Sequence, residues 1–198
     1  MMDYAKQLMT LIDKKSGLIT TKEVIDSAIP RQYLTRAVHN GQLRRVATGV
    51  YLKPDEWDDE TYRLQVTYSK LIFSHETALF YHGYSDRDPL VLNITLPNNY
   101  HSKKLNHAGY RIFYANKTFY PLEITDVKNH FGRDIRCYGI ERTLIDLLNP
   151  RYTMEIGVFL PALKQYMTEK ERNLPKLRAL AKQFNVYDRL KPYLEVLL

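Results

Sequence analysis

Asp126 and Lys128 form the clearest chemical pattern in the chain. They stand two residues apart in an expected strand, so both side chains lie on one face of it. The carboxylates of Glu76 and Asp88 precede them in the sequence. Two carboxylates can hold Mg²⁺ while a lysine orients a water molecule, as in metal-dependent nucleases. Because the pattern is short and common, a nuclease is kept only as an alternative interpretation.

Histidine and cysteine indicate structural rather than catalytic roles. His75-Glu76 begins like a zinc-protease motif, but that motif needs a second histidine at position 79, where Leu79 stands. His82 lies about two helical turns after His75, and no third metal ligand accompanies the two. Cys137, the only cysteine, cannot form an internal disulfide and is expected to be buried as a small apolar residue. We therefore expect no metal, no cofactor and no catalytic residue, and the chain is not predicted to be an enzyme.

The length and composition indicate an ordinary globular protein. With 198 residues, 44% apolar and 26% charged, the chain has room for one domain or two small ones. No apolar run approaches the ~18–20 residues needed to span a bilayer, and the first residues lack the apolar core of a signal peptide. These features predict a cytoplasmic protein without a membrane partner.

Basic residues are concentrated at both ends of the chain. Residues 1–53 contain nine basic and four acidic residues, for a net charge of +5. Residues 54–146 contain eleven and thirteen, for −2, and residues 147–198 contain nine and five, for +4. A basic N-terminal third favours a polyanionic partner such as nucleic acid, although a solvated basic surface would give the same totals.

The third expected helix, from Pro30 to Gly41, separates apolar from polar residues. Leu34 and its helical neighbours form an apolar side, and the opposite side is short, polar and basic without a single carboxylate. A helix that enters the DNA major groove must avoid carboxylates near phosphates and must carry side chains that bind base edges. The residues expected to contact DNA from this helix are Arg31, at its flank, and Gln32, Thr35, Arg36 and His39.

The residues after this helix predict a β-hairpin with two arginines. Arg44 and Arg45 precede a turn at Thr48-Gly49, so this hairpin would hold cations beside the DNA backbone. Alternation places one arginine on each face, so that one could contact DNA and the other pair with the acidic residues of the following linker. Three helices followed by this hairpin, which would be the wing, predict a winged helix-turn-helix.

An acidic linker at residues 54–60 marks the expected domain boundary. We predict a DNA-binding domain at residues 1–56 and a second, α+β domain at residues 57–198. The second domain is expected to have a small, mainly antiparallel sheet followed by C-terminal helices. Within it, Arg142 stands four residues before Asp146 on an expected helix and can pair with it. Arg178 and Lys182 lie outside the apolar stripe of a later helix and are expected to be exposed.

Several motifs together resemble the AbiEi abortive-infection antitoxins, over about residues 3–195. The motifs are Gly17-Leu18-Ile19-Thr20-Thr21, Pro30-Arg31-Gln32-Tyr33-Leu34, Asn40-Gly41-Gln42-Leu43-Arg44-Arg45-Val46, Gly49-Val50-Tyr51, Ser74-His75-Glu76-Thr77-Ala78-Leu79, His82-Gly83 and Glu141-Arg142-Thr143-Leu144-Ile145-Asp146. The combination of the wing motif with the Glu-Arg-Thr helix is fairly specific, whereas each piece alone is weak.

The resemblance implies an antitoxin of a type IV toxin–antitoxin system that acts in abortive phage infection. In that family the winged helix represses its own operon by binding inverted repeats in double-stranded promoter DNA. The C-terminal domain counters a nucleotidyltransferase-like toxin, and the two proteins need not form a stable complex. The exposed Arg178 and Lys182 are the residues expected to serve this second role. A transcription regulator with a ligand-sensing domain, and the nuclease described above, are the alternatives.

Overall fold

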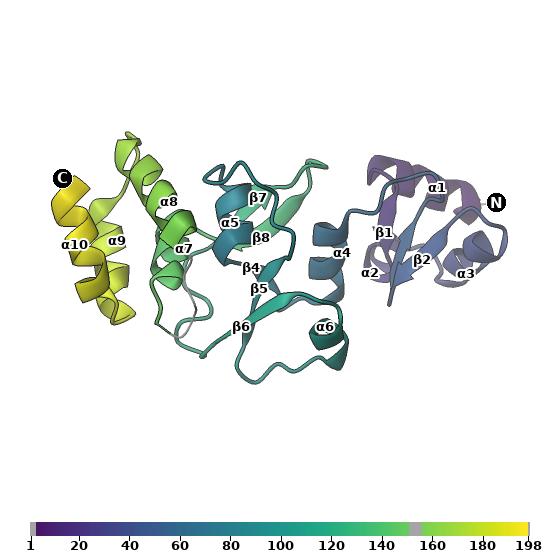
Figure 1. Cartoon of the computed structure of the whole chain (residues 1–198). Coiled ribbons are helices and arrows are strands. Elements are labelled where there is room, and N and C mark those ends of the chain that lie inside the picture. Colours follow the sequence, from purple (N-terminus) through teal and green to yellow (C-terminus); the bar gives the residue numbers. More distant parts are fainter. Residues whose placement is uncertain (1–2, 151–155, 198) are drawn as a thin grey trace. The chain divides into compact units, whose positions relative to one another are not determined.

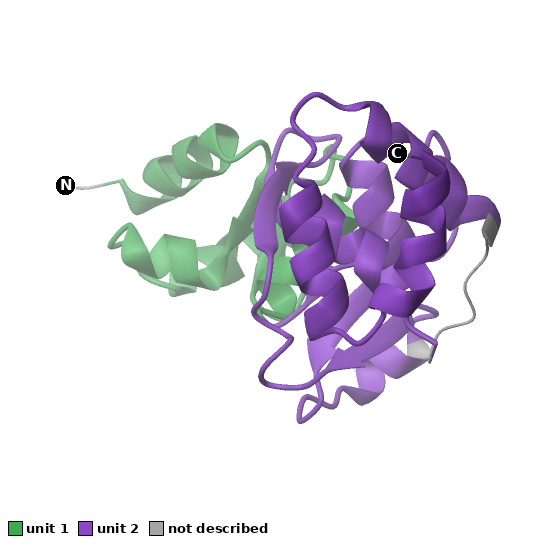
Figure 2. Ribbon diagram, turned by 90° about the vertical axis from the view of Figure 1, so that its left-hand side faces the viewer, with its two compact units in different colours: residues 1–69 green, residues 70–198 purple. Residues whose placement is uncertain are grey.

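In the computed structural model, which describes residues 3–150 and 156–197, the chain divides into two compact units, Met1–Ser69 and Lys70–Leu198 (Figure 2). Both units mix helices with strands, which confirms the expected α+β class (Figure 1). None of the helices in the described ranges combines the length and the apolar character that crossing a membrane requires.

The first unit has the element order of a winged helix-turn-helix. Its elements are α1 (Tyr4–Lys14), β1 (Leu18–Thr20), α2 (Thr21–Asp26), α3 (Gln32–His39), β2 (Arg44–Ala47), β3 (Val50–Leu52) and α4 (Glu60–Thr67). The three strands form an antiparallel sheet in the order β1-β3-β2. Strand β1 was not expected from the sequence, because three residues are too few to show an alternating pattern.

The helices of this unit pack around one apolar core and begin at recognisable caps. Leu8, Ile12, Val24 and Leu34 from the three helices are fully buried together. The spacing of Thr20 and Glu23 in the sequence predicts a capping box. The structure confirms it at the start of α2, since the Glu23 amide donates to the Thr20 hydroxyl and the Thr20 amide donates to the Glu23 carboxylate.

Helix α4 packs against the wing and therefore belongs to the first unit. Tyr62 and Val66 cover Leu18, Val50 and Leu52, which form a small apolar cluster of their own. The structural division thus follows α4, whereas the functional boundary expected at residues 56 and 57 remains a prediction.

The second unit is built on a five-stranded sheet. Its elements as far as the last strand are β4 (Ile72–Phe73), α5 (His75–Tyr81), β5 (Asn93–Pro97), α6 (Lys103–His107), β6 (Arg111–Ala115), β7 (Ile124–Lys128) and β8 (Asp134–Tyr138). The strand order is β6-β5-β4-β8-β7. The β4–β5 and β7–β8 pairs are antiparallel, and the β5–β6 and β4–β8 pairs are parallel. Cys137 on β8 pairs with Phe73 at the centre and is fully buried, as expected.

Four helices complete the second unit: α7 (Ile140–Leu147), α8 (Ile156–Thr168), α9 (Leu174–Gln183) and α10 (Tyr187–Leu197). Helix α5 contacts β5 and β8 of the sheet and also contacts α7, which in turn packs on α8 and α9 (Figure 1). Apolar residues of α5 and of these four helices form the largest core of the chain.

Substitutions at Gly17 and Gly41 test the contact between Gly17 and Glu56, a residue of the acidic segment after the wing. Both glycines have positive φ, +79° and +70°, but a Cβ on Gly17 would clash with the Glu56 side chain while one on Gly41 would meet open space. We expect Gly41→Ala to cost about 1–2 kcal/mol through the left-handed backbone alone, and Gly17→Ala to cost more. Urea unfolding followed by circular dichroism measures both, and equal losses would contradict the Glu56 contact.

Candidate functional site

Helix α3 presents the polar face that the sequence predicts. Leu34 and Ala37 are buried in the core of the unit, and the other side of the helix faces solvent. All seven residues expected to contact DNA are exposed: Arg31, Gln32, Thr35, Arg36, His39, Arg44 and Arg45. Since α3 contains no Asp or Glu, this face offers donors and cations to a ligand without a competing carboxylate.

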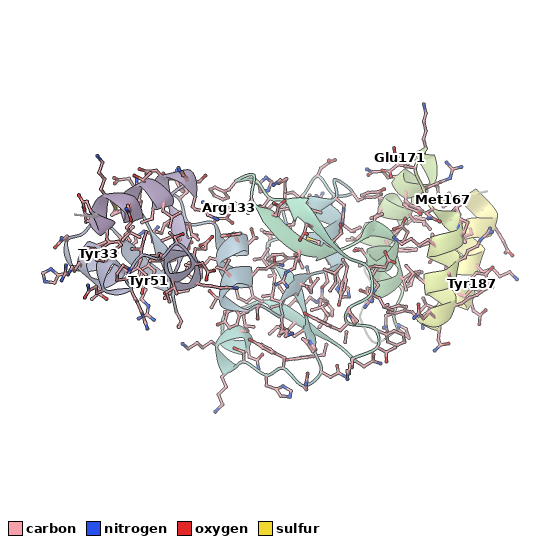
Figure 3. The ribbon with its side chains drawn as sticks, turned by 180° about the vertical axis from the view of Figure 1, so that it is seen from behind. Tyr33, Tyr51, Arg133, Met167, Glu171 and Tyr187 are labelled. Carbon is pink, nitrogen blue, oxygen red and sulfur yellow. The ribbon has the colours of Figure 1, made fainter. Side chains whose placement is uncertain are left out.

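Aromatic stacking restricts Arg36 on this face. Its guanidinium lies 5.3 Å from the centroid of the Tyr33 ring, one turn earlier on α3. Tyr33, labelled in Figure 3, in turn contacts the Tyr4 ring of α1 at 5.4 Å between centroids. An arginine held in this way loses less conformational freedom when it binds a base edge or a phosphate.

The two arginines of the wing take different partners. Arg44 donates from Nη2 to the backbone carbonyl of Glu56 at 3.3 Å. Arg45 donates from Nε to the carbonyl of Ala47, also at 3.3 Å, across a bulge between β2 and β3. The acidic segment therefore engages one of the arginines, as expected, although through a main-chain carbonyl rather than through a carboxylate.

The residues of the nuclease alternative lie on the surface without forming a metal site. Asp126 and Lys128 are exposed on β7, where Lys128 pairs with Asp134 of β8 at 2.8 Å. Glu76 pairs instead with Arg111 of β6 at 3.8 Å. Within residues 3–150 and 156–197, the side chains of His, Cys, Asp and Glu form no group of three that could hold a metal ion.

A cavity of about 340 Å³ in the second unit was not foreseen from the sequence. Its lining comes from α5, β5, β6, α7 and the segments that follow β5, β6, α7 and α9. The lining residues are His75, Thr95, Asn98, Phe113, Tyr114, Ala115, Asn116, Phe119, Arg142, Asp146, Asn149, Pro150, Phe184 and Asn185. Two motifs of the sequence, Ser-His-Glu and Glu-Arg-Thr, thus meet at one place, although no spacing between them indicates this.

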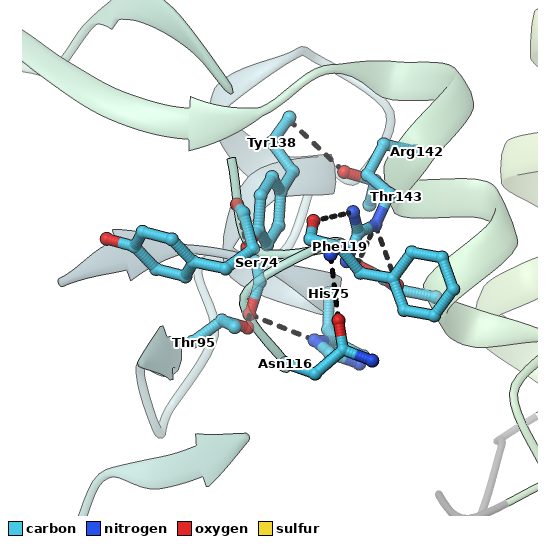
Figure 4. Close-up of polar contacts among 10 residues, drawn as sticks. Ser74, His75, Thr95, Asn116, Phe119, Tyr138, Arg142 and Thr143 are labelled. Carbon is cyan, nitrogen blue, oxygen red and sulfur yellow. Dashed lines mark hydrogen bonds and ion pairs between the residues drawn. The ribbon is translucent and has the colours of Figure 1, made fainter. Parts of the chain in front are cut away.

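His75 lies at the floor of this cavity in a strained backbone conformation. Its φ is +51°, and its ring stacks on Phe113 with 3.6 Å between centroids. The Ser74 hydroxyl lies 2.9 Å from His75 Nδ1 and accepts a hydrogen bond from Thr95 at 2.8 Å (Figure 4). The sequence predicts that Ser74 caps the helix that follows it. In the structure its side chain does not cap α5, because its hydroxyl is used in this chain of contacts.

Burial controls the protonation of His75. Burial, together with smaller effects of the positive charges of Arg142 and Arg111, lowers the pKa of the imidazole to about 3. The imidazole is therefore neutral at pH 7. His82, on the same helix, lies with Nε2 2.8 Å from the carbonyl oxygen of Tyr138, and burial lowers its pKa as well.

Arg142 and Asp146 form the buried pair expected from their spacing. Arg142 Nε donates to both carboxylate oxygens of Asp146 at 2.9 Å, and Nη1 donates to the carbonyl of Phe119 at 2.7 Å (Figure 4). The guanidinium lies between the rings of Tyr138 and Phe184, 4.4 and 4.1 Å from their centroids. Burial raises the pKa of Asp146 to about 6, although Arg142 acts in the opposite direction, so the carboxyl is mostly ionised at pH 7.

The residues expected to serve the second function lie on α9. Arg178 and Lys182 are exposed one turn apart, while Leu177 and Leu180 of the same helix are buried. Lys182 Nζ lies 5.4 Å from the ring centroid of Tyr187, which Figure 3 labels at the start of α10. The structure therefore places the two cations side by side on one surface.

Residues 6–52 match the model of a family described as "Transcriptional regulator, AbiEi antitoxin". This region is therefore similar to the AbiEi antitoxin family. The match covers α1 to β3, so the matched region coincides with the winged helix-turn-helix and contains the exposed face of α3. The family is one of regulators rather than of enzymes.

The fold of the matched region and of the unit that follows it has a counterpart among solved structures. The crystal structure of the RV2827C protein from Mycobacterium tuberculosis matches with a TM-score of 0.56 and 14% sequence identity, over 90% of this chain and 72% of that chain. At this identity the likeness concerns the fold alone. No curated protein matches the chain significantly.

The lowered pKa of His75 predicts that acid destabilises the second unit. An unfolded histidine titrates near ~6.5, so below that pH the unfolded chain binds a proton that folded His75 does not bind. Stability is therefore lost as the pH falls from about 6.5 towards 3, by about 2 kcal/mol between pH 7 and pH 5. His75→Asn should reduce this loss in urea unfolding at pH 7, 6 and 5. An unchanged pH dependence in the variant would contradict the assignment.

Proposed function

We propose that the chain is the antitoxin of a type IV toxin–antitoxin system acting in abortive phage infection. In this proposal residues 1–56 repress the chain's own operon in the cytoplasm, and residues 57–198 neutralise a nucleotidyltransferase-like toxin. The observation that carries the proposal is the exposed, carboxylate-free face of α3 within the region that matches the AbiEi family.

Helix α3 would read the major groove of the promoter. Arg36 and Gln32 have the side chains that bind guanine and adenine edges through paired hydrogen bonds, and Thr35 and His39 lie on the same exposed face. Arg31, at the start of the helix, is placed to reach a phosphate. The order of helices and strands supports this docking, since winged helix-turn-helix domains insert their second motif helix, here α3, into the groove.

The wing would add contacts that do not depend on sequence. Arg45, held at the turn by its bond to Ala47, would neutralise a phosphate beside the groove. Arg44 would do so after releasing the Glu56 carbonyl, and the acidic residues 55–60 would repel DNA beyond the wing. Two copies of the chain bound to the two halves of an inverted repeat would satisfy the symmetry of such a site.

The second unit would supply the antitoxin activity. Its C-terminal third carries a net charge of +4, and Arg178 and Lys182 expose two of these charges on one turn of α9. This surface would contact the acidic face of the toxin or a nucleic acid that the toxin uses. The buried faces of α9 and α10 belong to the core, so exposed side chains rather than apolar ones would make this contact.

A transcription regulator that senses a small molecule is the second candidate function. The cavity at His75 and Arg142 favours it, because this cavity lies in the unit that does not carry the winged helix. Both functions include binding to promoter DNA, and they differ in what the second unit recognises.

Arginine variants of the first unit should separate base reading from phosphate binding. Arg36→Ala should lose about 1–3 kcal/mol on the promoter and little on scrambled DNA, because it would remove a contact to a base edge. Arg45→Ala should weaken binding to both DNAs and reduce the salt slope by about one. Fluorescence anisotropy over a salt series measures both effects.

The matched control for these variants is Lys6. This residue is exposed on α1 and belongs neither to α3 nor to the wing. Lys6→Ala removes one positive charge and should leave the preference for the promoter unchanged. If a variant with Arg36, Arg44 and Arg45 all replaced by Ala bound the promoter as the wild type does, the proposed interface would be wrong.

Charge reversal on α9 should impair toxin neutralisation while leaving repression intact. The Arg178→Glu and Lys182→Glu double variant keeps the buried side of α9 and reverses only exposed charges. Growth during toxin expression should fall, while a promoter reporter stays repressed. The matched control is Lys103→Glu with Lys104→Glu, which reverses two exposed charges on α6. Full rescue by the α9 variant would rule out this surface.

A further inference from the structure

We propose that the cavity of the second unit binds a nucleoside, with the base against its aromatic wall and the base edge hydrogen-bonded to Arg142 and Asp146. This inference goes beyond the proposed function, since it requires neither promoter binding nor a toxin. It rests on four properties of the cavity: an Arg142 donor that its bonds to Asp146 and Phe119 do not use, a balanced charge, an aromatic wall and a rim of amide side chains.

Arg142 is the first reason to expect a polar ligand. It is only 2% exposed and lines the cavity. Among the described residues it donates from Nε to Asp146 and from Nη1 to Phe119, and none of these bonds uses Nη2. A carbonyl oxygen or ring nitrogen of a ligand in the cavity could accept a hydrogen bond from Nη2.

The charge of the lining favours a neutral ligand over an anion. Arg142 and Asp146 contribute one positive and one negative charge, and they bind each other. His75 is neutral because burial lowers its pKa to about 3, and the lining contains no lysine. A phosphate or a carboxylate would therefore bring an uncompensated charge into the cavity. A base edge suits the pair better, because it carries acceptors for Arg142 Nη2 beside donors for Asp146.

Aromatic rings form one wall of the cavity. Phe119 and Phe184 are half-buried, with 4.4 Å between their ring centroids and 31° between their planes. Tyr114, from β6, is an exposed aromatic residue of the same lining. The faces of such rings stack on bases of any sequence, as they do in proteins that bind single-stranded nucleic acid.

Amide side chains surround the mouth of the cavity. Asn98, Asn116 and Asn185 are exposed lining residues from three separate segments. Asn116 accepts a hydrogen bond from the Phe119 amide through Oδ1 (Figure 4), which leaves its NH₂ group as a donor. Amides combine donors with acceptors and can bind ribose hydroxyls. The volume of about 340 Å³ is at the small end of ligand sites, which suits one nucleoside.

The base could belong to a free nucleoside or to an unpaired position in RNA, and the experiment separates the two sources. The full-length chain is titrated by calorimetry with cytidine, uridine, adenosine and guanosine, and then with short single-stranded RNA and the same RNA as a duplex. We expect saturable 1:1 binding of at least one nucleoside. Tighter binding of single-stranded RNA that this nucleoside displaces would identify an unpaired base, and no such gain would identify the free nucleoside.

Rim variants connect the binding to this cavity. Asn98→Ala removes a lining amide, and Asn185→Gly removes another while keeping the φ of +57° that glycine readily adopts. Each should weaken binding about three- to tenfold, the effect of one lost hydrogen bond. Asn99→Ala, an exposed neighbour outside the lining, should leave the affinity unchanged. Absence of nucleoside and RNA binding, or binding that the rim variants leave unchanged, would overturn the proposal.

Discussion

The buried contact between Arg142 and Asp146 is the interaction on which the second unit most depends. It joins two turns of α7, and the same guanidinium binds the carbonyl of Phe119 in the loop after β6. Its two faces contact Tyr138 at the end of β8 and Phe184 at the end of α9. One side chain thus connects the sheet, a loop and the C-terminal helices. Replacing one member of such a pair leaves the other charge buried and unpaired, which typically costs about 3–5 kcal/mol.

In the first unit the functional candidates among the cations are exposed, whereas Arg142 of the second unit is buried. The main core cluster of the first unit is formed by hydrophobic side chains, and the exposed cations described above stand outside it, on α3 and on the wing. Tyr33 and the Glu56 carbonyl restrain Arg36 and Arg44 without neutralising them, because neither partner carries a negative charge at its contacting atoms. The two units therefore treat positive charge differently, since one exposes it to solvent and the other compensates it inside a cavity.

Features that depend on residues close together in the sequence could be predicted well. Features that depend on contacts between distant segments could not. The capping box of Thr20 and Glu23 and the pairing of Arg142 with Asp146 depend on neighbours within a few residues, and both were confirmed. Strands β1 and β4 have three and two residues, which is too few to show the alternation of polar and apolar residues that marks a strand. They are strands because they form hydrogen bonds with neighbouring strands. The cavity collects residues from 75 to 185, and no spacing in the sequence reveals such a convergence. Ser74 was misread for the same reason, because its true partners are His75 and the distant Thr95.

The position of Cys137 has a consequence for following the motions of the second unit. It is the only thiol of the chain, it has no exposed surface, and burial raises its pKa. It lies on β8 between β4 and β7, with sheet neighbours on both sides. Because its side chain points to a face of the sheet, a thiol reagent can reach it only when the packing against that face opens, and only the thiolate reacts. The rate at which Cys137 is chemically labelled therefore reports how often the packing around the central sheet opens. The measurement needs no added probe, because this cysteine belongs to the chain.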